Sequence, residues 1–145
     1  MSKVWYKVPN YSPYEVLPGV LTLTKEDYLP MLDTVQNCIN LFNETIDWDG
    51  MWTLSDAIQR FQEDNILFVW FGPDEKVIGY YWLDECYIYN VFIHPSRPEG
   101  LSKKFMQTGF NYASCDYFIL YCDDWNIRAQ KFFEKVGGIK QSSYL

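Results

Sequence analysis

The stretch that decides the fold reads Ile93-His94-Pro95-Ser96-Arg97-Pro98-Glu99-Gly100-Leu101-Ser102, followed by Lys103-Lys104. An apolar run of strand type precedes it and a helical pattern follows it, so the sequence predicts a strand that turns tightly into a helix. The first backbone N–H groups of a helix have no partner within the helix, and the helix dipole is positive at that end. Such a turn is typical of sites that hold a phosphate group. The spacing Arg97-x-x-Gly100-x-Ser102 matches neither the Walker pattern nor the dinucleotide fingerprint.

The composition predicts one folded domain over residues 1–145. Apolar residues make up 48% of the chain, which also holds 12 Tyr, 10 Phe and 6 Trp, and this argues against disorder. The formal net charge of −7 disfavours a nucleic-acid partner, since nucleic-acid binders present a basic surface. The acidic balance fits a cationic partner better. No segment has the ~20 apolar residues of a membrane span, so no membrane partner is expected.

The cysteines predict neither a metal site nor a disulfide framework. None forms a Cys-x-x-Cys pair, and the chain has a single histidine. Reduced and mostly buried thiols in a cytoplasmic protein are the simplest interpretation. Residues 1–7 lack the apolar run of a signal peptide, which fits the same location. The cysteines are Cys38, Cys86, Cys115 and Cys122.

The first half of the chain predicts an extended arm, a short strand and two helices. Three prolines predict an extended arm or short strands over residues 1–19, and residues 20–23 alternate like a strand. The hydroxyl of Thr24, followed three residues later by the carboxylate of Asp27, signals a helix over residues 24–42. Pro30 either delays the start of this helix or kinks it. Ser55 is the predicted cap of the second helix.

The second half predicts a meander and a crossover. Three strand patterns joined by tight turns predict an antiparallel meander, and the strand-helix-strand unit after it requires a parallel, right-handed crossover. A last helix ends at Gly137-Gly138. The sequence therefore predicts an α+β fold with a mixed sheet flanked by helices. The expected strands are 66–71, 77–83, 86–93 and 117–122, and the expected helices are 56–64, 100–113 and 126–136.

Two motifs resemble those of the GCN5-related N-acetyltransferase (GNAT) family. Arg97, Gly100 and Ser102 match the family's pyrophosphate loop, whose usual form is Gln/Arg-x-x-Gly-x-Gly/Ala. Residues 126–138, Asn-Ile-Arg-Ala-Gln-Lys-Phe-Phe-Glu-Lys-Val-Gly-Gly, are similar to the family pattern Asn-x-x-Ala-x-x-Phe/Leu-Tyr-x-x-x-Gly-Phe. The motifs stand in the family order, and the expected elements follow the order of the GNAT, or acyl-CoA N-acyltransferase-like, fold. The resemblance covers the core, residues 20–140.

The resemblance implies an N-acetyltransferase that uses acetyl-coenzyme A (acetyl-CoA) and transfers the acetyl group directly to an amine. In the family, the loop binds the pyrophosphate of coenzyme A, and free main-chain groups of the preceding strand pair with pantetheine. The acceptor would be an amine of a small molecule, peptide or protein, cationic ones included, and the protein a monomer or homodimer. The residues that the resemblance assigns to the cofactor are Phe92, Ile93, Arg97, Gly100, Leu101, Ser102, Lys103, Asn126 and Phe133.

Four positions depart from the family pattern. Ser102 stands for the final Gly or Ala of the loop, a small change, and Gly138 stands for the usual Phe. Pro98 removes one amide donor from the loop. Phe133 stands where many active members have a Tyr that protonates the departing thiolate, so the ring is kept and the proton donor is lost. General acid catalysis contributes about 10²–10⁴-fold where it operates. Tyr121, in the neighbouring strand, is a candidate substitute, and its alternative interpretation is an ordinary sheet residue.

The reaction also needs a base and a pocket for the amine. Glu85, at the turn that enters the central strand, is a candidate base, and a solvated turn residue is the alternative interpretation. Aromatic rings beside carboxylates suit a cationic amine. The candidate acceptor residues are Trp48, Asp49 and Trp52 between the first two helices, and Tyr87 and Tyr89 in the central strand.

A catalytically degenerate GNAT-fold protein with a binding or regulatory role is the alternative function. Phe133, Pro98 and the short tail after Gly138 favour it. The short tail also predicts that the last strands are short, or that the N-terminal arm covers that edge of the sheet.

Overall fold

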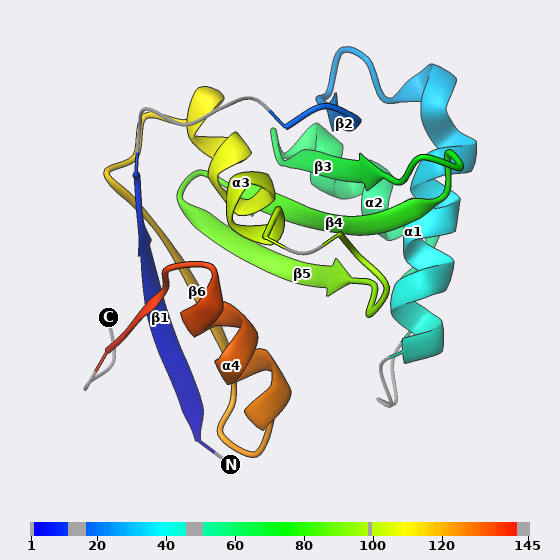
Figure 1. Cartoon of the computed structure of the whole chain (residues 1–145). Helices are drawn as coiled ribbons and strands as arrows, with labels where there is room; N and C mark the ends of the chain where they lie inside the picture. Colours follow the sequence, from blue (N-terminus) through cyan, green and yellow to red (C-terminus); the bar gives the residue numbers. More distant parts are fainter. Residues whose placement is uncertain (1, 12–16, 46–50, 99, 142–145) are drawn as a thin grey trace. The chain divides into compact units, whose positions relative to one another are not determined.

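The structure is a computed structural model, and it describes residues 2–11, 17–45, 51–98 and 100–141. Within these residues it holds seven strands and four α-helices (Figure 1). The chain divides into two compact units, and strand β5 (Tyr87–Ile93) contributes residues to both. Unit 1 comprises Met1–Pro18, Glu85–Tyr89 and Pro98–Leu145, and unit 2 comprises Gly19–Asp84 and Asn90–Arg97.

Unit 2 is built on three antiparallel strands, β2 (Val20–Leu23), β3 (Ile66–Phe71) and β4 (Val77–Asp84). Strand β3 lies between the other two and pairs with both. Most side chains of β3 and β4 are buried, which explains why both read as continuous apolar runs rather than alternating patterns. All three strands lie within one residue of their predicted ranges.

The two helices of unit 2 begin at different residues from those predicted. Helix α1 (Leu32–Thr45) follows a short 3-10 turn, η1 (Leu29–Met31), which contains the proline. Pro30 therefore delays the helix, because a proline lacks the N–H that a helix interior needs. Helix α2 (Leu54–Gln62) is capped by Thr53 and not by Ser55. A capping box needs a carboxylate three residues after the cap, and Asp56 stands at that distance from Thr53.

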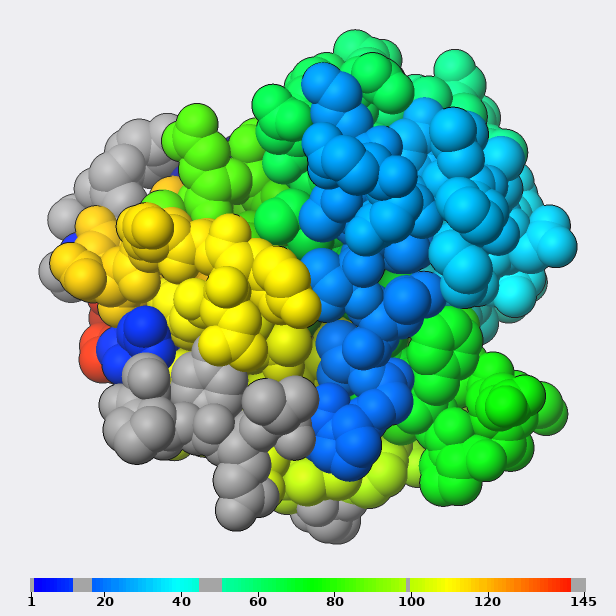
Figure 2. Space-filling view, turned by 90° about the horizontal axis from the view of Figure 1, so that it is seen from above, coloured from blue at the N-terminus to red at the C-terminus, as the bar shows by residue number. Residues whose placement is uncertain are grey.

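Aromatic rings join helix α2 to one face of β4. Phe61 of α2 stacks on Tyr28 at 4.4 Å and contacts Trp82 of β4 at 4.9 Å between ring centroids. On the other face of the strands, Phe68 and Tyr81 stack at 4.8 Å. Figure 1 shows α1 and α2 on the same side of β3 and β4, and Figure 2 shows the segment that leads from β2 to α1, in blue and cyan, at the surface.

The N-terminal strand is the main feature of unit 1. Strand β1 (Lys3–Pro9) pairs antiparallel with the whole of β6 (Tyr117–Asp123), and the two-residue β7 (Ile139–Lys140) pairs with β1. The first residues of β5 pair with β6 in parallel. Both parts of the prediction for this edge are confirmed, because the last strand is short and the N-terminal arm lies beside β6.

The helices of unit 1 are shorter than predicted. Helix α3 (Ser102–Gln107) passes into a 3-10 turn, η2 (Thr108–Asn111), instead of continuing to residue 113. Glycine at position 109 lowers helix propensity there, and Thr108 Oγ1 donates to the carbonyl of Lys104 at 3.0 Å. Helix α4 (Ile127–Lys135) is capped by Asn126 and is followed by Gly137 at a φ of +94°.

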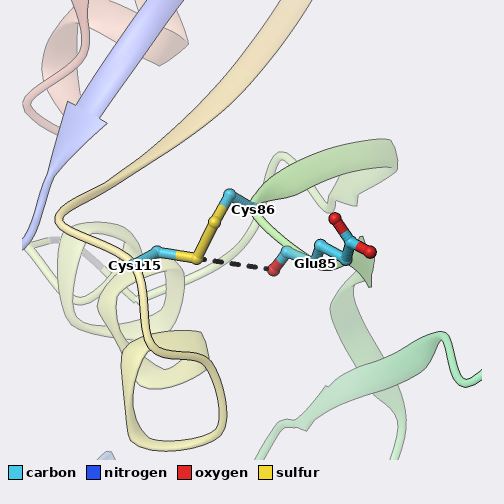
Figure 3. The surroundings of a disulfide bond; sticks show 3 residues. All are labelled: Glu85, Cys86 and Cys115. Atoms are coloured by element: carbon cyan, nitrogen blue, oxygen red, sulfur yellow. Dashed lines mark hydrogen bonds between the residues drawn. A yellow bond between two sulfur atoms is a disulfide. The ribbon is translucent and has the colours of Figure 1, made fainter.

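A disulfide bond joins Cys86 and Cys115 in unit 1, with their Cα atoms 6.0 Å apart (Figure 3). The prediction that all four cysteines are reduced was therefore wrong for this pair. The two cysteines are 29 residues apart in the sequence, and the parallel pairing of β5 with β6 brings the segments before the two strands together. Cys38 and Cys122 are free and buried, as predicted.

These pairings confirm the predicted α+β fold with a mixed sheet. Strands β3 and β4 of the meander are antiparallel. Strands β5 and β6, which precede and follow α3 in the sequence, are parallel. The expectation of one domain over residues 1–145 stays a prediction. None of the described helices combines the length and apolar character that a membrane span requires.

Candidate functional site

The turn after β5 is organised by His94 in unit 2. The backbone N–H of Ser96 donates to His94 Nδ1 at 3.0 Å, and the Ser96 hydroxyl lies 2.7 Å from the same nitrogen. A backbone N–H can only donate, so Nδ1 accepts and a neutral ring carries its proton on Nε2. The N–H of Arg97 donates to the carbonyl of His94 at 3.1 Å. His94 therefore shapes the loop.

The turn continues in unit 1 at Gly100, which opens α3. Gly100 has a φ of +78°, and, apart from its own residue and its two chain neighbours, no described residue has an atom within 4 Å of the place where a Cβ would stand. The positive φ is what requires glycine here, since the space beside it is open. Ser102, the first residue of α3, is buried, and Lys103 Nζ lies 4.2 Å from the ring centroid of Tyr11.

Two residues of the second motif have structural roles in α4. Asn126 Oδ1 accepts from the N–H of Ala129 at 3.1 Å, so this side chain caps the helix. Phe133 is 6% exposed and packs edge-on against Tyr6 of β1, with 5.5 Å between ring centroids. Their predicted contacts to coenzyme A stay predictions.

Tyr6 carries a buried hydroxyl without a hydrogen-bond partner among the described residues. Burial raises the pKa of Tyr6 above its ordinary value of 10.0, and the nearby Glu134 and Cys122 raise it further. The hydroxyl therefore stays protonated at neutral pH. Tyr6 was not among the predicted site residues, although the alternation of strand residues over positions 3–9 marks it as inward-facing.

Three of the predicted site residues come together on the face of β1 and β6 that lies opposite to Tyr6. The ring of Tyr87 is nearly parallel to that of Tyr89, at 5.7 Å, and to that of Tyr121, at 6.3 Å. Strand β1 adds two residues that were not among the predicted site residues. The ring of Trp5 is 5.0 Å from that of Tyr121, and Lys3 Nζ lies 4.4 Å from the same ring. The pairing of Trp5 with Tyr121 across β1 and β6 explains this group.

Glu85, the candidate base, lies in the exposed turn between β4 and β5, with a φ of +55°. Its carbonyl oxygen is 3.7 Å from Cys115 Sγ, and its carboxylate points away from the disulfide (Figure 3). Glu85 precedes β5, whereas Ile93 ends it, so the two residues stand at opposite ends of the strand. Its role as a base stays a prediction that this placement does not favour.

Trp52, the one described candidate from the loop between α1 and α2, is held firmly in unit 2. Asn43 pairs with both backbone groups of Trp52, and the indole contacts Phe42 at 6.2 Å and Trp82 at 5.9 Å. The guanidinium of Arg60 lies 5.7 Å from the ring centroid. Trp48 and Asp49 lie outside the described residues.

Two hollows of unit 2 meet at Trp52. One is a narrow, mostly apolar pocket between α1 and the strands, lined by Val35, Cys38, Ile39, Phe42, Trp52, Tyr80, Trp82 and Asn90. The other is a polar groove of about 290 Å³ along α2, lined by Met51, Trp52, Asp56, Gln59, Arg60 and Glu63. The groove carries two carboxylates and one guanidinium, so it has a net negative charge.

Phe92, a predicted cofactor residue, packs within unit 2. Its ring stacks on that of Tyr80 at 5.6 Å and contacts the ring of His94 at 6.4 Å. Tyr80 also donates a hydrogen bond to Asn90 Oδ1 at 3.1 Å. Tyr80 was not among the predicted site residues, because a tyrosine within an apolar strand is typical of the core.

Similarity to known proteins is found in the structure and not in the sequence. No protein-family model and no curated protein matches the sequence. An aminoglycoside acetyltransferase from an uncultured soil metagenomic sample, in complex with sisomicin, is similar in structure: it is 16% identical, with a TM-score of 0.63, over 87% of this chain and 91% of that one. A structure described as an acetyltransferase of the GNAT family, from Novosphingobium aromaticivorans, is 15% identical, with a TM-score of 0.59, over 96% of this chain and 59% of that one.

The chain has the GNAT fold. A conserved protein of unknown function from Staphylococcus epidermidis is also similar, at 10% identity and a TM-score of 0.63, over 96% of this chain and 57% of that one. The chain therefore spans little more than half the length of two of these three structures. Identities this low establish the GNAT fold and not the activity.

Proposed function

We propose that this chain is an acetyl-CoA-dependent N-acetyltransferase that transfers the acetyl group directly to an amine. The observation that carries the proposal is the turn at Gly100, which opens α3 in a chain with the GNAT fold. Gly100 is exposed, has a positive φ with open space where a Cβ would stand, and lies two residues before the first residue of α3. Accessible N–H groups at a helix start suit a pyrophosphate group.

The residues proposed to hold coenzyme A are those that the resemblance to the GNAT family assigns to the cofactor. The backbone of the end of β5 would pair with pantetheine, and the loop and its cations would bind the phosphates through charge-assisted hydrogen bonds. When bound, acetyl-CoA supplies the acetyl group as a thioester. The proposed residues are Phe92, Ile93 and Arg97 in unit 2, and Gly100, Leu101, Ser102, Lys103, Asn126 and Phe133 in unit 1.

The proposed acceptor is an amine, and a cationic one suits the charge of the chain. The net charge is −7, and the groove beside Trp52 carries Asp56 and Glu63. Both features favour a protonated amine over an anionic acceptor. Trp48, Asp49, Trp52, Tyr87 and Tyr89 stay the proposed acceptor residues. The aminoglycoside acetyltransferase of similar fold, which holds sisomicin, supports an amine acceptor.

The chemistry proposed for the chain's own residues has three parts. Backbone amides near Ile93 would polarise the carbonyl, in the manner of an oxyanion hole. Glu85 is the candidate base and Tyr121 the candidate acid, both from the sequence. Tyr121 stands among aromatic rings with Lys3 beside it, an environment that a bound substrate could share.

Binding tests the cofactor part of the proposal before any acceptor is known. Coenzyme A at about 1 mM should raise the midpoint of thermal unfolding, because a ligand that binds only the folded state stabilises it. Isothermal titration calorimetry should give a saturable affinity, and a panel of amines should then release free thiol from acetyl-CoA. If 1 mM coenzyme A leaves the midpoint unchanged, the cofactor proposal fails.

A matched pair of glycine variants separates binding from folding. Gly100→Ala places a Cβ in the loop at positive φ and should weaken coenzyme A binding by about tenfold or more. Gly19 also has a positive φ (+82°), and its added Cβ would lie 3.0 Å from the carbonyl oxygen of Phe71. Gly19→Ala should therefore lower stability and leave coenzyme A affinity unchanged.

The alternative is a GNAT-fold protein that binds without catalysing transfer. The observation that favours it is Phe133, which has no hydroxyl and is buried against Tyr6. Saturable binding of coenzyme A without thiol release from any amine would support it. In an active enzyme, Phe133→Tyr should raise kcat, and an unchanged kcat would remove this position from the mechanism.

The cellular location and the oligomeric state stay predictions. The sequence predicts a cytoplasmic protein that is a monomer or homodimer. The disulfide between Cys86 and Cys115 is an observation against the cytoplasm, because disulfides are rare in that compartment.

A further inference from the structure

Tyr80 of β4 contacts two residues of the next strand in the chain. Its hydroxyl donates to Asn90 Oδ1 at 3.1 Å, and its ring stacks on Phe92 at 5.6 Å with 18° between the ring planes. Tyr80 is 1% exposed, and all three residues belong to unit 2. The buried side chain of Tyr80 therefore contacts β5 at Asn90 and at Phe92, which are separated by one residue.

Asn90 has an unusual backbone conformation for a residue within a strand. Its φ is +55°, in the left-handed region, which asparagine tolerates better than most residues other than glycine. A left-handed residue inside a strand redirects the chain, as at a β-bulge, and interrupts the regular hydrogen bonding to the neighbouring strand. The residues that follow it, up to Ile93, depend on this redirection for their path.

The redirected segment is fixed again at its far end. The N–H of His94 donates to the carbonyl of Ile78 in β4 at 2.8 Å. Tyr80 and Ile78 are both in β4, so one strand anchors the segment at Asn90 and at His94. Phe92 and Ile93 lie between these two anchors, and these are the residues whose backbone is proposed to pair with pantetheine.

The surroundings of Tyr80 keep its hydroxyl a donor. Tyr80 lines the narrow, mostly apolar pocket that Cys38, Ile39 and Trp82 also line. Burial, and to a smaller extent Cys38, raises the pKa of Tyr80 well above 10.0. The phenol is therefore protonated at neutral pH, and the hydrogen bond to Asn90 is available throughout the physiological range.

We propose that Tyr80 is a positioning residue for coenzyme A: its hydrogen bond holds Asn90 in the left-handed conformation, and this directs the backbone of Phe92 and Ile93 toward the cofactor. The inference rests on the proposed function, which assigns that backbone to pantetheine. Tyr80 acts through Asn90 and Phe92 and makes no contact with substrate itself.

The test compares two conservative variants of buried tyrosines in unit 2. Tyr80→Phe keeps the ring on Phe92 and removes the hydrogen bond to Asn90. Tyr28→Phe is the matched control: Tyr28 is 4% exposed, stacks on Phe61, and its hydroxyl accepts from Gln62 Nε2 at 3.3 Å. Each variant loses one neutral hydrogen bond, so both should unfold at slightly lower temperature than the wild type.

Affinity for coenzyme A should separate the two variants. By isothermal titration calorimetry, Tyr80→Phe should bind roughly three- to tenfold more weakly, the range that one net hydrogen bond represents. Tyr28→Phe should bind as the wild type does. Amide hydrogen exchange without ligand gives an independent readout: the N–H groups of Phe92 and Ile93 should exchange faster in Tyr80→Phe only.

Two substitutions of Asn90 examine the acceptor side. Asn90→Asp keeps a side-chain oxygen and the tolerance for a left-handed φ, so it should retain wild-type affinity. Asn90→Ala removes both and should weaken binding at least as much as Tyr80→Phe does. The double variant Tyr80→Phe/Asn90→Ala should be no weaker than Asn90→Ala alone, because both changes break the same link.

The outcomes distinguish this inference from the function on which it rests. If the wild type does not bind coenzyme A, the proposed function fails and the inference fails with it. If the wild type binds and Tyr80→Phe binds equally well, with unchanged exchange at Phe92 and Ile93, the proposed function stands and the inference is wrong.

Discussion

Asn43 and Trp52 are joined by a pair of hydrogen bonds between one side chain and one backbone. Asn43 Nδ2 donates to the carbonyl of Trp52 at 2.9 Å, and Asn43 Oδ1 accepts from the N–H of Trp52 at 3.0 Å. The end of α1 is thereby connected to the residue that precedes the cap of α2. One amide side chain satisfies both backbone groups of Trp52, and both hydrogen bonds are partly buried.

Asn43→Ala should destabilise unit 2. The substitution leaves a donor and an acceptor of Trp52 without these partners, so we expect the free energy of unfolding to fall by about 1–3 kcal/mol, measured by urea denaturation. Gln36→Ala is the control, because Gln36 makes an exposed hydrogen bond to Asn40 on the same helix. Equal effects of the two variants would show that the pair is not structurally important.

Tyr6→Phe should stabilise the protein. The hydroxyl of Tyr6 is buried and has no partner among the described residues, so its removal relieves a desolvation cost of about 1–3 kcal/mol. Most buried Tyr→Phe changes act in the opposite direction, as we expect for Tyr28→Phe. Thermal unfolding of both variants measures the difference. A midpoint below that of the wild type for Tyr6→Phe would indicate a partner for the hydroxyl, such as an ordered water.

Reduction of the disulfide should lower stability. The bond between Cys86 and Cys115 closes a loop across 29 residues, and a cross-link of this length contributes roughly 2–4 kcal/mol in the chain-entropy model. Dithiothreitol should therefore lower the unfolding midpoint of the wild type and leave the double variant Cys86→Ser/Cys115→Ser unchanged. Thiol counting under denaturing conditions should give two free thiols before reduction and four after it.

Gly137→Ala should be among the more destabilising single substitutions in unit 1. An added Cβ would lie 2.7 Å from Tyr11 Cε2, and the φ of +94° is strained for any residue with a Cβ. We expect a loss of about 1–3 kcal/mol in unfolding free energy. In a Tyr11→Ala background the steric part should disappear and the backbone part should stay. If that background restores full stability, the conformation of Gly137 carries no strain.

Stability should decrease at alkaline pH through Cys38. Burial raises the pKa of this thiol from 9.0 to about 12 in the folded protein. The folded state holds the proton more tightly than the unfolded state, so this contribution is complete below about pH 9 and is lost as the pH rises toward 12. Tyr80, whose pKa is also raised by burial, acts in the same direction at higher pH.

Cys38→Ala tests this dependence. Urea denaturation at pH 7, 9 and 10.5 should show a smaller decrease in unfolding free energy between pH 9 and 10.5 for the variant than for the wild type. The variant should be less stable at pH 7, because it loses buried volume. The same decrease in both proteins would contradict the role of the thiol.

Local patterns were sufficient for most of the secondary structure. Strand β3 has the predicted range, and β2, β4 and β6 lie within one residue of theirs, because apolar runs and turn residues are properties of neighbouring positions. The predicted start of the last helix at residue 126 was correct to within one residue for the same reason. The errors at Ser55 and at the end of α3 were also local: a capping box and a helix-breaking glycine competed with the periodic pattern.

Contacts between distant segments could not be read in this way. The sequence by itself determined the elements, their order and the turn at Gly100. Only the tertiary structure decided that Cys86 meets Cys115, that β1 supplies Trp5 to the ring of Tyr121, and that Tyr80 holds Asn90. A helix or strand depends on residues a few positions apart, whereas these contacts depend on strand pairing and register, which bring together segments far apart in the chain.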